Sequence, residues 1–264
     1  MNINGSEVHV YVINMDSAPE RMSHMKSQLD RLGISYTRQS GVIGAELKEP
    51  HPDFSAWSYK YLHGRLWAPR ELGCYLSHIE CLKNLLLTDA AYALILEDDV
   101  TLHPDIQKVI HTALNYRIDW NMLRLSTVNH GKWWTVRAID DHFKLGICLT
   151  REKGAGGYLV DRLAASQMLK LLMPMRLSWD IAFDLEWFLG FRTLGVHPMP
   201  VSQESDFETQ IQQDLYKIKI KGIGKYITVI PFRTFLEISR LIFRLLQLVK
   251  MKFLADSSTK CNFD

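Results

Sequence analysis

The stretch Ala91-Tyr-Ala-Leu-Ile-Leu-Glu-Asp-Asp-Val100 decides the fold class. Its first six residues form a fully apolar run, which is typical of a strand that is buried on both faces. The run stops abruptly at Glu97, Asp98 and Asp99. In open α/β sheets, ligands bind beyond the carboxyl ends of the strands, and these three acids would lie there. The sequence therefore predicts an α/β protein with a polar site at the end of this strand.

The chain before this stretch opens as strand, helix and strand. Val8 to Ile13 is a short β-branched and aromatic run that fits a buried strand. Ser17-Ala-Pro-Glu20 has the pattern of a capping box, and Gly33 is a typical helix stop. A second strand is expected over 34–38. This β-α-β opening predicts a mixed, largely parallel sheet flanked by helices.

The rest of the chain divides into a body and a tail. We expect a long aromatic-rich loop over 41–69, helices over 71–87, 161–173 and 178–189 and from Pro104, mixed strands over 122–160, and a last strand over 191–196. The division predicts a catalytic domain over 1–214 and a basic amphipathic segment over 215–264.

Adjacent carboxylates after a buried strand need an explanation, because like charges raise one another's pKa and resist desolvation. A bound divalent cation commonly offsets this repulsion and desolvation. Oxygen ligands favour Mn²⁺ or Mg²⁺, and such an ion also stabilises the charge that develops on a diphosphate leaving group. The alternative is an acidic turn that is simply solvated.

Several ordered blocks resemble glycosyltransferase family 25, which includes bacterial lipooligosaccharide galactosyltransferases. The blocks cover the chain to about Gln203 and are V-Y-V-I-N-M-D-S-A-P-E-R-M at 10–22, E-L-G-C-Y-L-S-H at 71–78, L-I-L-E-D-D-V at 94–100, G-A-G-G-Y-L-V at 154–160 and S-W-D at 178–180. The resemblance implies a GT-A-like fold, a UDP-sugar donor, and transfer of a hexose, usually galactose, to an acceptor hydroxyl.

By the same resemblance, the acidic triplet looks like the DxD-type motif of GT-A enzymes. Asp99 would then bind the metal directly. Asp98 would approach the ribose or the metal. Glu97 would act through a water molecule or hold the Asp98 and Asp99 side chains in position.

Further donor-binding candidates follow the first strand, lie on the 71–87 helix, and lie in the glycine-rich block: Asn14, Asp16, Arg21, Glu71, Ser77, His78, Gly156 and Gly157. Arg21 suits phosphate or uridine carbonyls, although it could equally be a solvated helix charge, and Asp16 could be a helix cap. His78 matches the family pattern, although a lone histidine on a packed helix is usually a core residue. The glycines do not form a Rossmann fingerprint, and close approach to a sugar is the better interpretation.

The acceptor side is expected at Ser178-Trp179-Asp180. A carboxylate beside an indole could take the hydroxyl proton while the indole stacks on a sugar. Transfer with inversion needs one such base, and Asp180 is the first choice and Asp184 the second. His197, together with Gln203, is a candidate to complete the metal or phosphate site, although packing within a loop is an equal alternative for His197.

Charge and composition indicate the partners. From Leu215 onward there are 10 Lys/Arg and 3 Asp/Glu, which leaves 21 basic and 26 acidic residues before it, so the body carries −5 and the tail +7. Arg233, Glu237, Arg240, Arg244 and Gln247 form one polar stripe on an otherwise apolar helix, which is typical of an interfacial helix on an anionic membrane. Docking on the body or a homodimer contact are the alternatives.

No basic region precedes Arg21 and no uncharged apolar run approaches the roughly 18 residues that a membrane span needs, so a secreted or membrane-spanning protein is not expected. The four cysteines form no CxxC pair, which favours reduced thiols in the cytoplasm. An acidic body argues against nucleic acid.

These features together predict an inverting, Mn²⁺- or Mg²⁺-assisted galactosyltransferase that uses UDP-galactose. Its acceptor would be a lipooligosaccharide at the cytoplasmic face of the bacterial inner membrane. The alternatives are a metal-dependent phosphohydrolase and a non-catalytic carbohydrate-binding module on the membrane surface.

Overall fold

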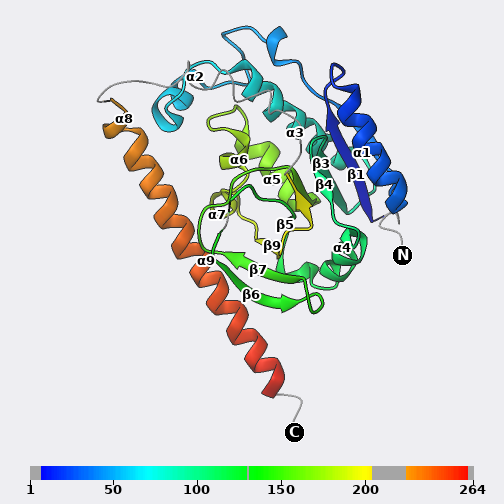
Figure 1. The fold of residues 1–264 in the computed structure, drawn as a ribbon. Coiled ribbons are helices and arrows are strands. Elements are labelled where there is room, and N and C mark those ends of the chain that lie inside the picture. Colours follow the sequence, from blue (N-terminus) through cyan, green and yellow to red (C-terminus); the bar gives the residue numbers. More distant parts are fainter. Residues whose placement is uncertain (1–6, 130, 204–223, 261–264) are drawn as a thin grey trace.

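An eight-stranded mixed sheet forms the centre of the molecule (Figure 1). The computed structural model describes residues 7–129, 131–203 and 224–260. The strands lie in the order β2-β1-β3-β8-β5-β9-β7-β6, and a separate pair joins β10 to β4. Their bounds are β1 Val8–Asn14, β2 Thr37–Ser40, β3 Tyr92–Glu97, β4 Thr101–Leu102, β5 Met122–Arg124, β6 Trp133–Ala138, β7 Lys144–Cys148, β8 Gly157–Asp161, β9 Thr193–His197 and β10 Val201–Ser202.

Helices cover both faces of this sheet. They are α1 Pro19–Leu32, α2 Ala56–Ser58, α3 Pro69–Leu87, α4 Ile106–Leu114, α5 Arg162–Leu172, α6 Trp179–Ala182, α7 Glu186–Leu189, α8 Gly224–Ile227 and α9 Val229–Lys260. The predicted α/β class, with a mixed sheet flanked by helices, is confirmed. Strand β8 is antiparallel to both of its neighbours, β3 and β5, and β7 is antiparallel to β9 and β6, so these two strands run against the rest.

The apolar run of β3 is explained by the two cores that it separates. Ile95 packs in the core that contains α3 and α5, while its neighbours Leu94 and Leu96 pack in the core that contains α1 and α4. Successive residues of a strand point to opposite faces, so a central strand between two helical layers must be apolar throughout.

Strand β1 is the parallel partner of β3, with Ile13 opposite Glu97. Parallel pairing brings the carboxyl ends of both strands to one edge of the sheet. Asn14 and the acidic triplet are therefore close together although they are more than 80 residues apart in the sequence.

Three predicted element boundaries are wrong. Helix α1 has Ala18 as its N-cap and no side-chain cap, so the expected capping box does not form. The second strand begins at Thr37, because Ile34 instead packs into the core beside α1. The helix expected over 178–189 is two short helices, α6 and α7.

The long C-terminal helix α9 runs along the outer edge of the domain and extends beyond it (Figure 1). The predicted boundary at residues 214 and 215 lies outside the described residues, as do Lys217, Lys219, Lys221 and Cys261. The other three cysteines are free thiols. Among the described helices, none has the combination of length and apolar character that a membrane crossing requires.

Candidate functional site

The carboxyl edge of β1 and β3 brings an amide, an arginine and two carboxylates together. Asn14 Nδ2 donates to Asp98 Oδ2 at 2.7 Å. Arg21, which lies on the first turns of α1, places Nη1 3.3 Å from Asp98 Oδ1 and 3.6 Å from Asp99 Oδ2. Asp98 is buried, and the Asp99 side chain is 18% exposed. The sequence prediction that Asn14, Arg21, Asp98 and Asp99 meet at one edge agrees with this geometry.

Burial and like charge make these carboxylates hard to ionise. Burial raises the pKa of Asp98, and Glu97 adds to this rise, while Asn14 and Arg21 oppose it. The pKa of Asp99 is raised to about 6, first by burial and then by Glu97 and Asp98, against the opposing charge of Arg21. Asp99 Oδ1 is also buried without a hydrogen-bond partner in the described part of the chain.

A divalent cation fits this arrangement. A buried carboxylate oxygen without a donor, beside two further carboxylates, is a costly state that a bound cation would relieve. The ligands at Asp98 and Asp99 are oxygens, which hard ions such as Mn²⁺ and Mg²⁺ prefer.

Glu97, the third acid, belongs to a different set of contacts. His78 Nε2 lies 3.3 Å from Glu97 Oε1, and Gln203 Nε2 donates to Glu97 Oε2 at 3.2 Å. The other ring nitrogen of His78 lies 3.2 Å from the hydroxyl of Tyr158, and the imidazole stacks on the indole of Trp179 with 4.9 Å between centroids. His78 is thus a fully enclosed residue that holds Glu97 in place.

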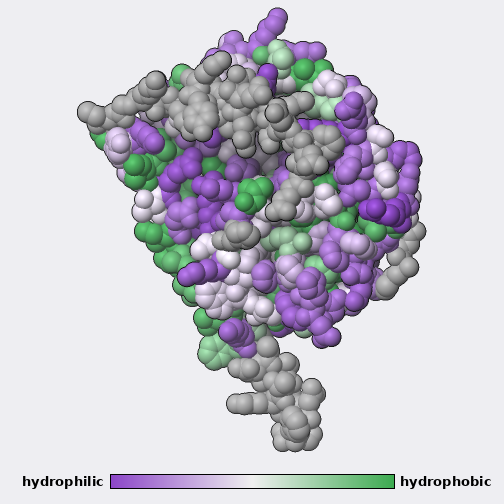
Figure 2. Space-filling model, in the orientation of Figure 1, coloured by the Kyte–Doolittle hydropathy of each residue, from purple (hydrophilic) through white to green (hydrophobic). Residues whose placement is uncertain are grey.

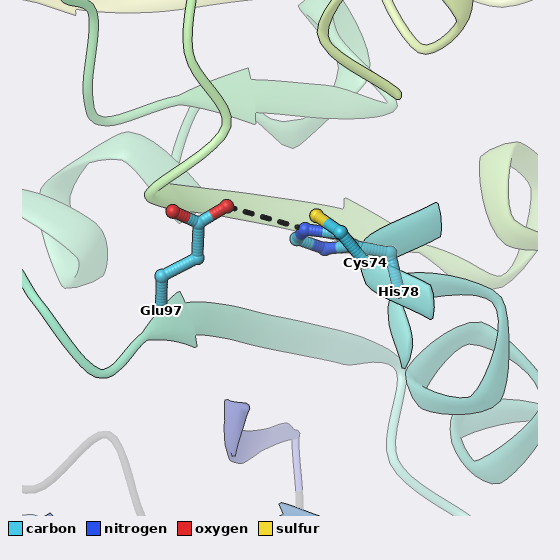
Figure 3. Close-up of side chains that lie close together, drawn as sticks. All are labelled: Cys74, His78 and Glu97. Atoms are coloured by element: carbon cyan, nitrogen blue, oxygen red, sulfur yellow. Dashed lines mark hydrogen bonds and ion pairs between the residues drawn. The ribbon is translucent and has the colours of Figure 1, made fainter. Parts of the chain in front are cut away.

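Cys74, His78 and Glu97 point toward one another, the first two from α3 and the third from the end of β3 (Figure 3). Their ligand atoms all lie within 4.8 Å of one another. However, the pKa of the Cys74 thiol is well above its ordinary value, because of burial and the nearby carboxylates of Glu97, Glu71, Asp180 and Asp99. A metal ion bound by this trio would have to displace the thiol proton, and it would find one sulfur, one nitrogen and one carboxylate oxygen as ligands.

Asp180 lies on the same side of the molecule as the acidic triplet. Its neighbour Trp179 stacks on His78, and His78 contacts Glu97. Asp180 accepts a hydrogen bond from Ser178 Oγ at 2.6 Å and has Arg151 Nη2 at 3.9 Å. Its side chain is 35% exposed, so it is accessible to a hydroxyl group.

Asp184 lies in a different place, and its assignment as the second choice of base does not fit the structure. It is fully buried, with Arg124 Nη2 at 2.9 Å, Arg244 Nη2 at 2.8 Å and Arg240 Nε at 3.1 Å. Burial acts to raise its pKa, but these three arginines outweigh burial and lower it. Asp184 is therefore a structural carboxylate whose charged form three arginines favour, and it has no open face for an acceptor.

His197 is also in the wrong place for the predicted metal site. It stacks on Trp133 with the rings 7° from parallel, and its partner in the sheet is Lys144. Three strand spacings separate β9 from β3, which is about 14 Å. Gln203, which was considered together with it, does reach the triplet through Glu97.

The remaining predicted donor residues make internal contacts. Asp16 is exposed and accepts hydrogen bonds from Arg38 and Ser40. Ser77 Oγ accepts from the backbone N–H of Val42 and fastens a loop to α3. Glu71 is held by Tyr59 and Arg65.

The two glycines make room for the chain itself. A Cβ on Gly156 would lie 2.7 Å from Gln203, and a Cβ on Gly157 would lie 3.0 Å from Val201. The close contacts of these two glycines are therefore with residues 201–203, whereas the sequence predicted that they would approach a sugar.

The sequence reasoning missed Arg38 and Arg151. Arg38 Nε donates to Asn14 Oδ1 at 2.9 Å, because β2 is parallel to β1 and its residues 38–40 reach the same edge. The strand predicted over 34–38 stops before Ser40, the residue that lies opposite Asn14, so the prediction did not place this strand beside Asn14. Arg151 precedes the glycine-rich block and gave no signal in the sequence.

The sequence model of a family described as "Glycosyltransferase family 25 (LPS biosynthesis protein)" matches residues 7–184. This range contains Asp98 and Asp99, together with Asn14, Arg21 and Asp180.

Individual relatives agree with this match. The chain is 27% identical over 194 residues to a glycosyltransferase 25 family member of Anopheles gambiae, covering 67% of this chain and 32% of the relative. It is 28% identical over 127 residues to procollagen galactosyltransferase 1-A of Xenopus laevis, covering 44% of this chain and 20% of the relative. It is 25% identical over 209 residues to the lacto-N-neotetraose biosynthesis glycosyltransferase LgtB of Neisseria meningitidis, covering 75% of this chain and 68% of the relative. The chain thus spans only a fifth to a third of the two animal relatives.

Proposed function

Since the chain belongs to glycosyltransferase family 25, we propose that it transfers a hexose from a nucleoside-diphosphate sugar to a sugar hydroxyl, with the help of Mn²⁺ or Mg²⁺. The donor in this proposal is UDP-galactose, and the acceptor is a saccharide of a bacterial lipooligosaccharide.

One observation carries the proposal: Asp99 Oδ1 has no hydrogen-bond partner among the described residues, and it lies beside Arg21 and Asp98 at the carboxyl edge of two parallel strands. This edge is where α/β proteins bind nucleotides. A carboxylate that lacks a donor calls for a cation, and an adjacent arginine suits a phosphate. A diphosphate that binds together with a divalent ion would satisfy both requirements.

Asp99 and Asp98 would hold the ion in this arrangement. The ion would neutralise charge on the diphosphate as it leaves. Arg21, beside both carboxylates, would contribute a positive charge on the same side, where it could pair with phosphate oxygens. Glu97 is kept in position by His78 and Gln203 and adds to the negative field that attracts the cation.

Asp180 is the proposed base. The acceptor hydroxyl oxygen attacks the anomeric carbon on the face opposite the diphosphate, and a new carbon–oxygen bond forms as the bond from that carbon to the diphosphate oxygen breaks. The electron pair of the broken bond leaves with UDP, and the hydroxyl proton passes to Asp180. Ser178 and Arg151 orient the Asp180 carboxylate for this transfer.

The choice of galactose and of a saccharide acceptor is supported by the names of relatives. One is a procollagen galactosyltransferase and another takes part in lacto-N-neotetraose biosynthesis. The description of the matching family as an LPS biosynthesis protein supports a lipopolysaccharide-type acceptor.

Release of UDP from a panel of UDP-sugars, with and without Mn²⁺, tests the proposal. We expect UDP-galactose to be hydrolysed slowly without an acceptor, only with the cation, and not by Asp99→Asn. No UDP from any donor would overturn the proposal. Release of UMP and a sugar 1-phosphate would favour the phosphohydrolase alternative, and sugar binding without turnover would favour the carbohydrate-binding module.

A further inference from the structure

The polar stripe of α9 faces the domain, which resolves one alternative that the sequence left open. Arg240 and Arg244 are almost completely buried. Arg240 pairs with Asp184, and Arg244 Nε donates to Glu186 Oε1 at 2.7 Å. The docked side of α9 combines these arginines with Leu236, Leu248 and Met251, which are buried in the two cores, and a second, aliphatic side of the helix faces outward.

This outward side is apolar without interruption. Every exposed residue of α9 from position 238 to position 249 is aliphatic. These residues recur at intervals of three and four, so they form one face, and they are Ile238, Leu241, Ile242, Leu245, Leu246 and Val249. Phe235 and Phe253 extend the face at its two ends. In Figure 2, hydrophobic side chains follow the edge of the molecule along which α9 runs in Figure 1.

A face of this kind is uncommon on a protein that is surrounded by water. Scattered exposed apolar residues are normal, but a contiguous patch marks a surface that something covers. Ile242 is 54% exposed and Leu246 is 66% exposed, so the two central residues have most of their contact area still available.

Positive charge lies at both ends of the face. Lys225 precedes it, and Lys250 and Lys252 close it, all exposed. A groove of about 630 Å³ adjoins the first end, and Arg65, Arg233 and Lys225 line it together with one acid, Glu237, which pairs with Arg240. Ile230 and Ile238, which line the same groove, join it to the apolar face.

We propose that α9 lies flat on an anionic lipid surface, with its aliphatic face in the boundary between headgroups and acyl chains and its lysine-bearing ends at the lipid phosphates. Apolar burial and attraction to anionic headgroups are the two forces that hold interfacial helices. The charge pattern disfavours a second copy of the chain as the covering partner. A two-fold pairing of antiparallel α9 helices would set Lys225 and the basic groove of one copy against Lys250 and Lys252 of the other.

Arg233 lines this groove and also a second pocket that Arg151 lines, and Arg151 Nη2 lies 3.9 Å from Asp180 Oδ2. With Asp180 as the base of the proposed function, a lipid-linked acceptor would approach it from this side. Binding of α9 and of the adjoining basic residues to lipid does not depend on the proposed function.

Co-sedimentation of the full chain with vesicles tests the proposal. One set of vesicles contains phosphatidylcholine and phosphatidylglycerol, and the other contains phosphatidylcholine alone. We expect strong binding to the first set, weaker binding to the second, and a fall in binding to the first set as salt is raised. The variant Ile242→Gln/Leu246→Gln is expected to bind at least about tenfold more weakly.

Leu87→Gln/Ile118→Gln is the matched control, since it removes two exposed aliphatic side chains from other parts of the domain. It should bind vesicles like the unaltered protein. Equal binding by both double variants would overturn the proposal, as would a lack of vesicle binding by the unaltered protein. A dimer in solution that Ile242→Gln/Leu246→Gln converts to a monomer would also overturn it and would assign the face to a second copy. Thermal unfolding of each variant shows that the fold is retained.

Discussion

Replacing Asp99 by asparagine should stabilise the metal-free protein at neutral pH while removing its affinity for the cation. The pKa of the Asp99 carboxyl is raised from 3.8 to about 6 by burial and by Glu97 and Asp98. A raised carboxyl pKa means that the folded state holds the proton more tightly than the unfolded state does. The associated stability is complete below about pH 4 and is lost as pH rises through about 6.

The size of the effect follows from the shift. About two pKa units at roughly 1.4 kcal/mol each give a penalty of up to about 3 kcal/mol at pH 7.5. Asparagine has nearly the same shape and no charge. The Asp99→Asn variant should therefore regain about 1–3 kcal/mol in the free energy of unfolding at pH 7.5. In a chain of this size, each kcal/mol corresponds to about 2–4 °C in Tm.

Urea unfolding with EDTA at pH 7.5 and at pH 4 provides the assay. Asp99→Asn should be more stable than the unaltered protein at pH 7.5 and equal to it at pH 4. Asp89→Asn, an exposed aspartate in the turn before β3, is the control and should change little at either pH. A loss of stability at pH 7.5, or the same difference at both pH values, would refute the electrostatic account of this site.

Three further predictions concern the base, the cation and the helix. Asp180→Asn should lower kcat by at least about 100-fold with little change in donor KM, and a rate within a few-fold of the unaltered enzyme would remove Asp180 from the base role. Mn²⁺ affinity, measured by calorimetry, should fall as pH drops below about 6 because Asp99 becomes protonated, and a flat profile from pH 7 to 5 would contradict this. Arg244→Met should cost about 3–5 kcal/mol in urea unfolding, because it leaves Asp184 and Glu186 undercompensated in the core. Lys250→Met on the same helix should cost almost nothing, and equal losses would show that the buried pair is unimportant.

The acidic edge could be predicted because the information is local. An apolar run that ends in Glu97-Asp98-Asp99 determines both a buried central strand and the position of its carboxyl end. Asn14 follows a second such run, and parallel pairing of the two strands then brings these polar residues together.

The other contacts depend on register and on distant partners. Whether Arg38 reaches Asn14 depends on where β2 begins, which a four-residue strand does not reveal. Asp184 is the next acid after Asp180 in the sequence, and it was the second choice of base for that reason. Its three arginines come from position 124 and from α9, at positions 240 and 244, which no local pattern connects.

The orientation of α9 also depends on residues that are distant from it in the sequence. A helix with one polar stripe can place that stripe in water or against buried carboxylates, and its own residues do not decide between these. Asp184 and Glu186 decide it, since they would be buried without compensation if Arg240 and Arg244 faced outward.

The central claim is that the edge formed by Asp98, Asp99 and Arg21 binds a diphosphate through a divalent cation. Calorimetric titration of UDP into the protein, with Mn²⁺ and with EDTA, tests it most directly. We predict that UDP binds at least about tenfold more tightly with the cation, and that UDP strengthens Mn²⁺ binding by the same factor. Equal affinity for UDP with and without Mn²⁺ would contradict the account.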